Sequence, residues 1–400
     1  MFAEYNELVN LLFYSFVFIT FILVLIYFLI RGKAKKAYVH KVQRNWRVVS
    51  KQNVEPTEHF VILIGDTGAP KLDGKDEVLS LLKLKLDEVG ENSTVIFLGD
   101  IVYPVGLPEP GHKYYELSEK RLLAQLEILK DYKGDVYFLS GNHDWNRSRG
   151  PGLDSVNRQQ NYIESYLGRR NVYLPANGCP GPVEVELTPQ LTLIIINTSW
   201  WVHRGTKPLG EKFGCVKSEE NFFVKFKELL EENKKKDILI AAHHPLYSKA
   251  LHGGKFDLKA HLFPLTAAHK SLYIPLPGVG SIYPAYRKYV GALEDMSHPK
   301  YRSMRKQLLN TIAPYRNIVW AAGHDHNLQY LTKNGHHHIV SGAGSKIAYV
   351  KSGGKSVIFT HAHKGFFVLD YKTDEAVWMQ VWEPEAGKKN GKLAFSSKIY

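Results

Sequence analysis

Five short polar motifs, each placed directly after an apolar run, constrain the fold of this chain more than any other feature. The apolar runs have the length and composition of buried strands, and segments with helical spacing separate the first three. Strands that alternate with helices predict an α/β architecture with parallel pairing, in which the carboxyl ends of the strands meet at one edge. The side chains of the motifs should therefore converge. The motifs are Gly65-Asp66-Thr67-Gly68, Gly99-Asp100-Ile101-Val102-Tyr103, Gly141-Asn142-His143-Asp144, His243-His244-Pro245 and Gly323-His324-Asp325-His326.

The later part of the chain departs from this alternation in two places. Residues from about 253 to 305 are rich in Pro, Gly and Tyr, and we interpret them as an ordered insertion near the site, such as a lid. From His337 onward the strands are shorter and separated by turns, which indicates a second, more antiparallel sheet. The expected strands are 59–64, 94–98, 136–139, 191–196, 238–242, 318–322, 337–340, 356–360, 365–369 and 376–382, and the expected helices are 76–89 and 118–130.

The motifs supply carboxylates, an amide, a phenol and imidazoles, which are ligands that suit first-row transition metals. Each residue alone has an ordinary alternative. Asp66 is equally typical of a turn, and His243 or His324 of a hydrogen-bonded buried histidine. The joint order of the five motifs favours a shared metal site over these alternatives.

Together the motifs resemble the calcineurin-like metallophosphoesterase superfamily, and within it the small, animal-type purple acid phosphatases. The superfamily normally carries Asp-x-His in its first motif, whereas Gly68 stands at the histidine position here. Tyr103 stands three residues after Asp100, where purple acid phosphatases have a metal-binding tyrosine. The resemblance covers roughly residues 60–382 apart from the insertion, and includes Ser341-Gly342-Ala343-Gly344. It implies a four-layer αββα sandwich of two mixed sheets.

The resemblance also implies two metal ions bridged by Asp100. A phenolate is a hard anionic donor, so Tyr103 indicates Fe(III) in its site, with Fe(II), Zn or Mn in the second. The alternative for Tyr103 is a half-buried aromatic without a ligand role. Carried over position by position, the ligands of the first ion are Asp66, Tyr103 and His326, and those of the second are Asn142, His243 and His324.

The implied reaction is hydrolysis of a phosphomonoester by attack of metal-bound hydroxide, with no covalent intermediate. His143 and His252 match two histidines beside the metals in the family, and imidazole suits proton donation to the leaving group. Asp144 is expected to orient or charge His143, with a helix N-cap as the alternative. His244 is assigned no ligand role. We interpret His336-His337-His338 as solvated or structural, because this run lies outside every motif.

The stretch from Leu8 to Ile30 contains no charged residue and is long enough to cross a bilayer. It predicts a single N-terminal transmembrane helix, because Glu4 and Glu7 before it differ from the basic start of a signal peptide. A buried core helix is the alternative. Between Arg31 and Gln52 there are eight Lys or Arg residues and no acid, so the positive-inside rule predicts a cytoplasmic catalytic domain. A periplasmic or extracellular domain is the alternative.

The same basic stretch indicates attraction to the anionic membrane lipid surface. We expect no nucleic-acid partner, because a basic run beside a membrane span is more typical of an orientation signal. Cys179 and Cys215 are either two thiols or one disulfide, and a disulfide would favour an exported domain. The expected organisation is an anchor segment (1–30), a basic linker (31–55), a metallophosphoesterase domain (56–385) and a C-terminal extension (386–400).

Two other functions are compatible with this organisation. The same site would serve a phosphodiesterase or pyrophosphatase that acts on a lipid-linked or nucleotide substrate. A catalytically silent membrane binding module is the alternative from another class, although such a module would usually have lost ligands. The sequence leaves the physiological phosphate ester and the oligomeric state open.

Overall fold

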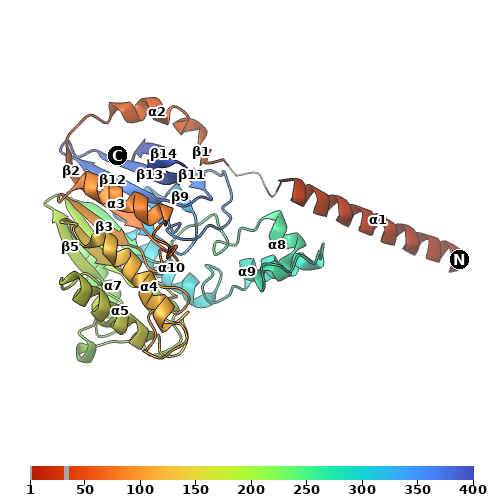
Figure 1. The fold of residues 1–400 in the computed structure, drawn as a ribbon, viewed down its shortest axis with the longest axis horizontal. Coiled ribbons are helices and arrows are strands. Elements are labelled where there is room, and N and C mark those ends of the chain that lie inside the picture. The colour runs from red at the N-terminus through yellow and green to blue at the C-terminus, as the bar shows by residue number, and fades with distance from the viewer. Residues whose placement is uncertain (1, 31–35) are drawn as a thin grey trace.

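A computed structural model describes residues 2–30 and 36–400, and its strands form two sheets (Figure 1). The strands are β1 (Tyr38–Val39), β2 (Thr57–Ile64), β3 (Ser93–Phe97), β4 (Asp135–Phe138), β5 (Val183–Thr188), β6 (Leu191–Ile196), β7 (Asp237–Ala242), β8 (Ile318–Ala322), β9 (Leu328–Lys333), β10 (His336–Ser341), β11 (Val357–His361), β12 (Phe366–Lys372), β13 (Val377–Glu385) and β14 (Lys388–Lys398). The α-helices are α1 (Phe2–Ile30), α2 (Trp46–Val49), α3 (Glu77–Val89), α4 (Tyr115–Leu126), α5 (Gly152–Leu167), α6 (Ser199–Val202), α7 (Glu219–Glu232), α8 (Leu258–Leu262), α9 (Ile282–Tyr289) and α10 (Pro299–Ile312). The 3-10 helices are η1 (Lys41–Gln43), η2 (Ser50–Gln52), η3 (Glu127–Leu129), η4 (Ala176–Gly178), η5 (Glu211–Phe213), η6 (Pro264–Ala267) and η7 (Val279–Ser281).

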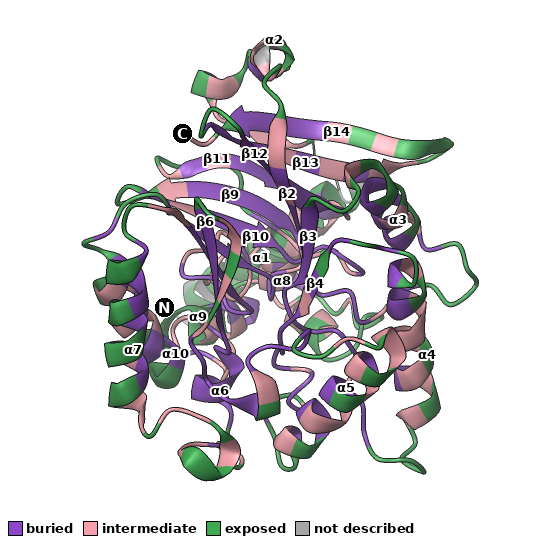
Figure 2. Ribbon diagram, turned by 90° about the vertical axis from the view of Figure 1, so that its left-hand side faces the viewer, coloured by how far each residue is buried: buried purple, intermediate pink, exposed green. Residues whose placement is uncertain are grey.

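The eight-stranded sheet has a parallel centre and antiparallel edges, whereas the six-stranded sheet is antiparallel at one end and parallel at the other. The eight-stranded sheet has the order β1-β11-β9-β10-β8-β7-β6-β5, and the six-stranded sheet has the order β14-β13-β12-β2-β3-β4. The parallel pairs are β2–β3, β3–β4, β6–β7, β7–β8 and β8–β10. The sheets face each other, with α7 and α10 outside the eight-stranded sheet and α3, α4 and α5 outside the six-stranded one (Figure 2). This confirms the expected αββα sandwich.

The alternation of side chains along the strands builds two cores. In β2, Ile62 and Ile64 belong to the core beneath the helices, whereas Val61 and Leu63 belong to the core between the sheets. Successive strand residues point to opposite faces, so a strand buried on both faces must be apolar at every position. The buried run of β2 therefore anchors both layers directly before Asp66.

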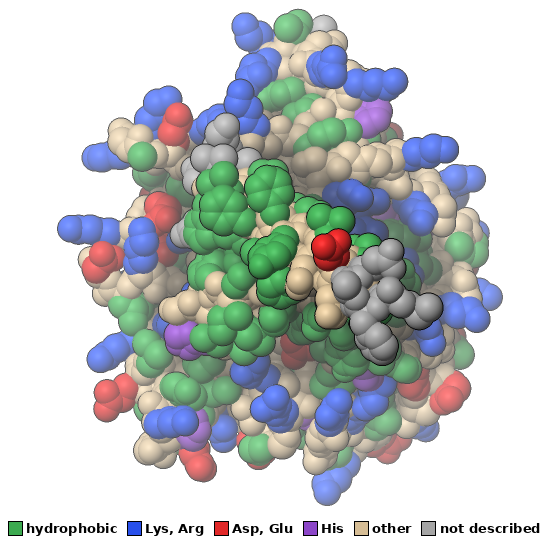
Figure 3. Space-filling model, turned by 90° about the vertical axis from the view of Figure 1, so that its right-hand side faces the viewer, with side chains coloured by type: hydrophobic (Ala, Val, Ile, Leu, Met, Phe, Trp, Pro, Cys, Tyr) green, Lys and Arg blue, Asp and Glu red, His purple; other side chains and the backbone are tan. Residues whose placement is uncertain are grey.

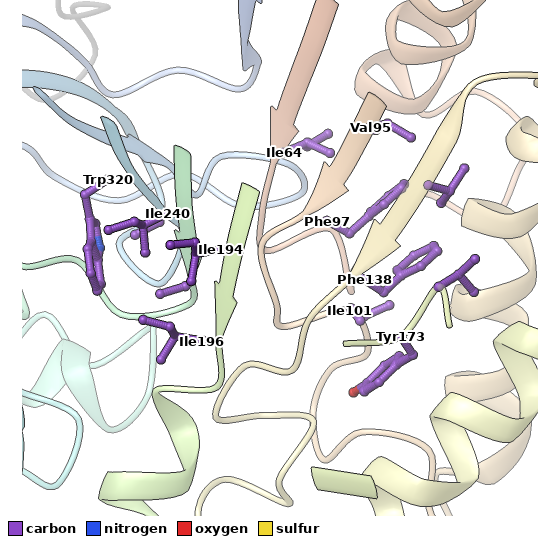
Figure 4. Packing of buried hydrophobic residues seen from close by; sticks show 14 of the residues in the cluster. Ile64, Val95, Phe97, Ile101, Phe138, Tyr173, Ile194, Ile196, Ile240 and Trp320 are labelled. Atoms are coloured by element: carbon purple, nitrogen blue, oxygen red, sulfur yellow. The ribbon is translucent and has the colours of Figure 1, made fainter. Parts of the chain in front are cut away.

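Large apolar side chains fill the core beneath the helices on each sheet (Figure 4). On the six-stranded sheet the rings of Phe97 and Phe138 stack with centroids 4.3 Å apart. On the eight-stranded sheet Ile240 and Trp320 are fully buried under the helices. The strand ends that carry the motifs are therefore held by rigid packing on both sides.

The strands after His337 do not form a sheet of their own, so that expectation was wrong. β10 and β11 extend the eight-stranded sheet, whereas β12, β13 and β14 extend the six-stranded one. The reason is that β12 pairs antiparallel with β2, with Phe367 opposite Leu63, and so returns the chain to the first sheet. Residues Lys388–Lys398 form β14 against β13, so most of the expected C-terminal extension is part of the domain.

The domain also includes part of the expected basic linker. Tyr38–Val39 pairs with β11, and Trp46 is buried with its ring centroid 5.8 Å from that of Phe395. Arg31, Lys33 and Lys35 of the basic stretch fall within residues 31–35, which lie outside the described residues. The globular domain therefore begins well before the expected boundary at residue 56.

The N-terminal helix α1 projects away from the domain, and its segment Tyr5–Phe28 is long and apolar enough to cross a membrane (Figure 1). The mean hydropathy of its most apolar window is 2.6. Only 6% of that window is buried, so the helix is not a core helix of the domain. The insertion is ordered, as expected, and its α8 contacts the last turns of α1.

Cys179 and Cys215 form a disulfide, with their Cα atoms 5.4 Å apart. Of the two alternatives that the sequence left open, the disulfide is the one that the structure contains. The bond ties the segment after η4 to the segment after η5, across 36 residues of sequence.

The His336-His337-His338 run lies in β10, and two of its three rings are buried. The expectation that these histidines are solvated was wrong, and their burial supports a structural role. The His338 ring lies edge-on to Tyr247 with centroids 4.8 Å apart, and neither of its nitrogens has a hydrogen-bond partner. Burial lowers the pKa of His338 to about 3, and the charges of His336 and His337 act in the same direction.

His338→Leu is expected to weaken the acid sensitivity of folding. Because the folded pKa lies below the unfolded value of about 6.5, the unfolded chain takes up the proton first. The stability contribution is complete above pH 6.5 and is lost as the pH falls towards 3. Between pH 7 and pH 5 the unmodified chain should lose about 2 kcal/mol more unfolding free energy than the variant. Guanidinium unfolding followed by tryptophan fluorescence measures this. The exposed His112→Leu serves as control, and equal pH slopes for His338→Leu and the parent would contradict the expectation.

Candidate metal centre

The five motifs lie at the carboxyl ends of β2, β3, β4, β7 and β8, as expected. Three motif residues there have left-handed backbone conformations, with φ of 58° at Asp66, 53° at Asp100 and 71° at His324. Asp tolerates this region better than most residues, and such backbone strain is concentrated at functional sites. The turns aim these three side chains back across the ends of the strands.

Gly68 has a packing reason that the sequence did not reveal. A Cβ at this position would lie 2.7 Å from the Asp100 carbonyl oxygen and 2.7 Å from the amide nitrogens of Val102 and Tyr103. The loop that delivers Tyr103 therefore occupies the space that a histidine would need. The absence of a histidine at Gly68 and the presence of Tyr103 therefore have the same packing cause.

The first group of donors consists of Asp66, Tyr103 and His326. The Tyr103 hydroxyl lies 2.8 Å from Asp66 Oδ1 and 3.0 Å from His326 Nε2. His326 Nε2 lies 3.4 Å from Asp66 Oδ1. All three potential ligand atoms thus converge on one point from β2, the loop after β3 and the loop after β8.

The second group consists of Asn142, His243 and His324. His243 Nε2 and His324 Nδ1 lie 2.9 and 3.1 Å from Asn142 Oδ1 and 3.3 Å from each other. His243 Nδ1 donates to the Leu98 carbonyl and His324 Nε2 donates to the Glu294 carbonyl. These bonds fix the tautomers, so the two facing nitrogens are the unprotonated ones. A pair of imidazole lone pairs aimed at one point is the arrangement that a metal requires.

Asp100 lies between the two groups. Its Oδ1 is 3.6 Å from His243 Nε2 of the second group. On the other side, Asp66, Asp100 and His326 each offer a ligand atom within 4.8 Å of the others. One carboxylate with two oxygens is therefore within reach of both points.

The electrostatics of the site fit cations. Burial raises the pKa of Asp66 to about 7, reinforced by Asp100 and opposed by His243. Burial raises the pKa of Tyr103 well above its usual value, and the charges of Asp100 and Asp66 add to this. Buried anionic donors of this kind ionise when a metal ion supplies the opposite charge. The donor set therefore fits two metal ions, with Asp100 shared.

The two predicted proton donors point at this centre. His143 Nδ1 donates to the Pro104 carbonyl at 2.7 Å, which leaves Nε2 directed towards Asp100 Oδ2 at 3.9 Å. Burial lowers the pKa of His143, which the charge of Asp100 opposes. The His252 ring lies 4.0 Å from the His324 ring, and its Nδ1 contacts Asp295 Oδ1 at 3.0 Å. Burial opposes protonation of His252, but the hydrogen bond to Asp295 and the charges of Asp325 and Asp295 together outweigh it, so the pKa of His252 lies above its usual value.

Asp144 does not contact His143, so its expected role was wrong. Its carboxylate accepts from the amides of Ile101 at 3.1 Å and Gly141 at 2.7 Å, and from Gln159 at 3.1 Å. No helix starts beside it, so the N-cap alternative was wrong as well. The Asp144 carboxylate therefore holds together the two loops that carry Asp100 and Asn142.

Several residues at the centre were missed by the sequence analysis. Lys346 places its ammonium 2.9 Å from the centroid of the Tyr103 ring. Burial lowers the pKa of Lys346 to about 8, against the charges of Asp100 and Asp66. The insertion contributes Asp295 to His252 and the Glu294 carbonyl to His324. A position shortly after Ser341-Gly342-Ala343-Gly344 was the one available signal for Lys346, and the insertion residues had none.

A separate cluster of possible metal ligands lies outside the motifs. His361, His363 and Glu383 each offer a ligand atom within 4.8 Å of the others. His361 Nδ1 already contacts Glu383 Oε1 at 2.5 Å, a short hydrogen-bond distance. These residues belong to the ends of β11 and β13, apart from the converging donors.

Residues 61–365 match the family model of the calcineurin-like phosphoesterases. The chain belongs to this family. Calcineurin-like phosphoesterases bind two metal ions, in agreement with the two groups of donor atoms around Asp100. Membership supports a hydrolase that acts on phosphate esters. No curated protein sequence gives a significant match to the chain.

Two solved structures share this fold. The purple acid phosphatase PPD1 from yellow lupin (Lupinus luteus) seeds is 15% identical over 85% of this chain and 53% of that chain, with a TM-score of 0.53. GAP50, described as the anchor in the inner membrane complex of Plasmodium, is 16% identical over 86% of this chain and 89% of that chain, with a TM-score of 0.50. This chain spans about half of the lupin enzyme. At these identities the likeness is one of fold.

Proposed function

We propose that this calcineurin-like phosphoesterase is a membrane-anchored, dinuclear metal-dependent phosphatase that hydrolyses phosphomonoesters and resembles the purple acid phosphatases. The observation that carries the proposal is the convergence of two donor groups on a shared Asp100. Two bound ions would activate water and neutralise the oxygens of the phosphoryl group. The proposed ligands are Asp66, Asp100, Tyr103, Asn142, His243, His324 and His326.

The residues around the donors would orient the ester and supply its proton. His143 directs its Nε2 towards Asp100, and the Nδ1 atoms of His143 and His252 are bonded elsewhere, so each imidazole would give a proton to the leaving oxygen through Nε2. Lys346 adds a positive charge on the side of Tyr103. The proposed iron rests on Tyr103, since phenolate favours a hard, high-valent ion, and the amide and imidazole donors of the second group suit Fe(II), Zn or Mn.

The test uses the full chain purified in detergent. We expect turnover of p-nitrophenyl phosphate, about two metal ions per chain and an absorption band in the visible. Protein without turnover after loading with Fe, Zn or Mn would refute the phosphatase. Colourless protein with full activity on Zn or Mn alone would refute only the iron.

A lipid-linked phosphodiester or pyrophosphate substrate is a second candidate, supported by the place of the insertion. The insertion contacts α1 through Phe263 and the metal centre through Asp295. Deletion of residues 254–299 would remove the partner of His252, so it cannot separate the two substrate classes. Comparison of p-nitrophenyl phosphate with a lipid phosphodiester on the intact chain does separate them.

A silent membrane module has one supporting observation, the fold shared with the Plasmodium protein that is described as an anchor. The complete donor set argues against it, because a binding module has no need for two imidazoles aimed at one amide oxygen. The turnover assay distinguishes this candidate from the phosphatase.

We propose that α1 anchors the protein and that its domain faces an oxidising compartment. The basic stretch predicted the cytoplasmic face, but the Cys179–Cys215 bond supports the exported alternative, since disulfides persist in oxidising compartments. In intact cells a maleimide is expected to alkylate both cysteines only after reduction. Alkylation of both without reduction would restore the cytoplasmic placement.

A further inference from the structure

The insertion presents an apolar surface without acidic residues beside α1. Residues 258–293 contain no Asp or Glu, and their basic residues are Lys259, Lys270, Arg287 and Lys288. Nine large apolar side chains of this segment are exposed, a concentration that usually marks an interaction site. We call these nine residues the insertion surface: Leu258, Leu265, Leu272, Ile274, Val279, Ile282, Tyr286, Tyr289 and Val290.

The helix α9 carries the centre of the insertion surface and has its apolar stripe turned outward. Ile282, Tyr286 and Tyr289 stand at the i, i+4 and i+7 positions, which lie on one face of a helix. Ile282 and Tyr289 are 66% and 70% exposed. Arg287 points the other way, with its side chain only 13% exposed, and donates to Asp295. The apolar face of α9 is therefore exposed, whereas a surface helix of a soluble domain normally packs its apolar face against the core.

The contact between the insertion and α1 determines how deep the insertion surface lies in the bilayer that α1 crosses. Tyr27 of α1 is buried against Phe263, with ring centroids 5.0 Å apart, and Leu23 packs against the same cluster. Leu23 precedes Phe28, the end of the candidate span, by about 8 Å at the rise of an α-helix. Interfacial helices bury their apolar face by roughly 5–10 Å. With Phe28 at the end of the span, the contact between the insertion and α1 lies at the boundary of the hydrocarbon layer.

We propose that the insertion surface inserts into the interfacial region of the bilayer that α1 crosses, so that lipid is its occupant. Its continuity with α1 supports lipid over a protein partner. So does its charge, because basic residues without acids suit the phosphates of headgroups. Viewed along α1, the apolar side chains at the middle of this face include those of α1 itself, and Lys and Arg side chains surround them (Figure 3). The inference rests on the proposed anchor and is independent of catalysis.

The proposal gives α9 two faces with different tasks. The outer stripe contacts lipid, while Arg287 on the inner side holds Asp295, which in turn holds His252. Asp295 has no side-chain exposure, so this chain of contacts is shielded from water. The metal centre is thereby fixed relative to the membrane surface by one short helix.

The test places a fluorescent label in the full chain reconstituted into phosphatidylcholine vesicles. The described residues contain no free cysteine, so Ile282→Cys or Val290→Cys supplies a single reactive thiol. A nitrobenzoxadiazole label at either position is expected to shift its emission to the blue and to be quenched by phosphatidylcholine with a nitroxide near the headgroup. The same label at Val224→Cys on α7, where the native side chain is 54% exposed, is the matched control and should do neither.

Labels at Ile282 and Val290 that behave like the label at Val224 would overturn the proposal. A blue shift that depends on protein concentration and occurs without quenching by lipid would assign the surface to a second copy of the chain. That result would overturn the proposal as well. Vesicles that contain phosphatidylserine should strengthen the quenching, since the surface is basic. The Asp100→Asn chain is expected to give the same fluorescence, so that failure of this inference and failure of the phosphatase are distinguishable.

Discussion

Asp100→Asn is expected to lower phosphatase turnover by on the order of 10³-fold. Metal ions supply several kcal/mol of charge stabilisation in such reactions, and each 1.4 kcal/mol corresponds to about a factor of ten. Asp100 lies within reach of both donor groups, so its replacement by a neutral amide weakens both positions at once. The measurement is kcat for p-nitrophenyl phosphate, together with metal content.

The fold should survive this substitution. Asn tolerates the left-handed φ of 53° at this position, and its side-chain oxygen can still accept from the His143 amide, now at 2.8 Å. The matched control is Asp87→Asn, which removes an exposed carboxylate on α3 and should leave kcat unchanged. Normal turnover in a metal-loaded Asp100→Asn chain would refute the bridging role of this carboxylate.

The converging donors could be predicted from the sequence because local rules place them. A buried parallel strand ends where its apolar run ends, and neighbouring strands end at one edge. Asp66, Asn142 and His243 follow their strands within four residues, so the position of each strand fixes the side chain that follows it. The resemblance to the purple acid phosphatases then supplied the assignment of these donors to two groups.

The hydrogen-bond partners of these residues could not be predicted, because they come from segments whose apolar residues follow neither helical nor strand spacing. Asp295 and the Glu294 carbonyl reach His252 and His324 only through the tertiary path of the insertion. Neither residue stands in a motif. The same limit explains the error over Asp144, whose carboxylate turns back to the amides before it instead of towards its neighbour in sequence.

The assignment of strands to sheets failed for a related reason. Alternation along β12 and β13 identifies strands, but it does not say which sheet they join. Pairing of β12 with β2 is a contact between residues about 300 positions apart in the chain. Nothing in the local pattern distinguishes this partner from β11.

Tyr103→Phe is expected to abolish the visible absorption and to lower the iron content of the purified chain, because charge transfer to Fe(III) requires the phenolate oxygen. The hydroxyl that would be lost is the atom shared between Asp66 and His326, whereas the ring that remains keeps its edge contact with His143 at 4.4 Å. The loss should therefore be one of metal binding and not of folding. Tyr173→Phe, an equally buried phenol outside the donor groups, is the matched control and should keep the colour. A Tyr103→Phe chain that retains the band would place the chromophore elsewhere, and would leave the tight packing of Gly68 against the Tyr103 loop without a role in metal selection.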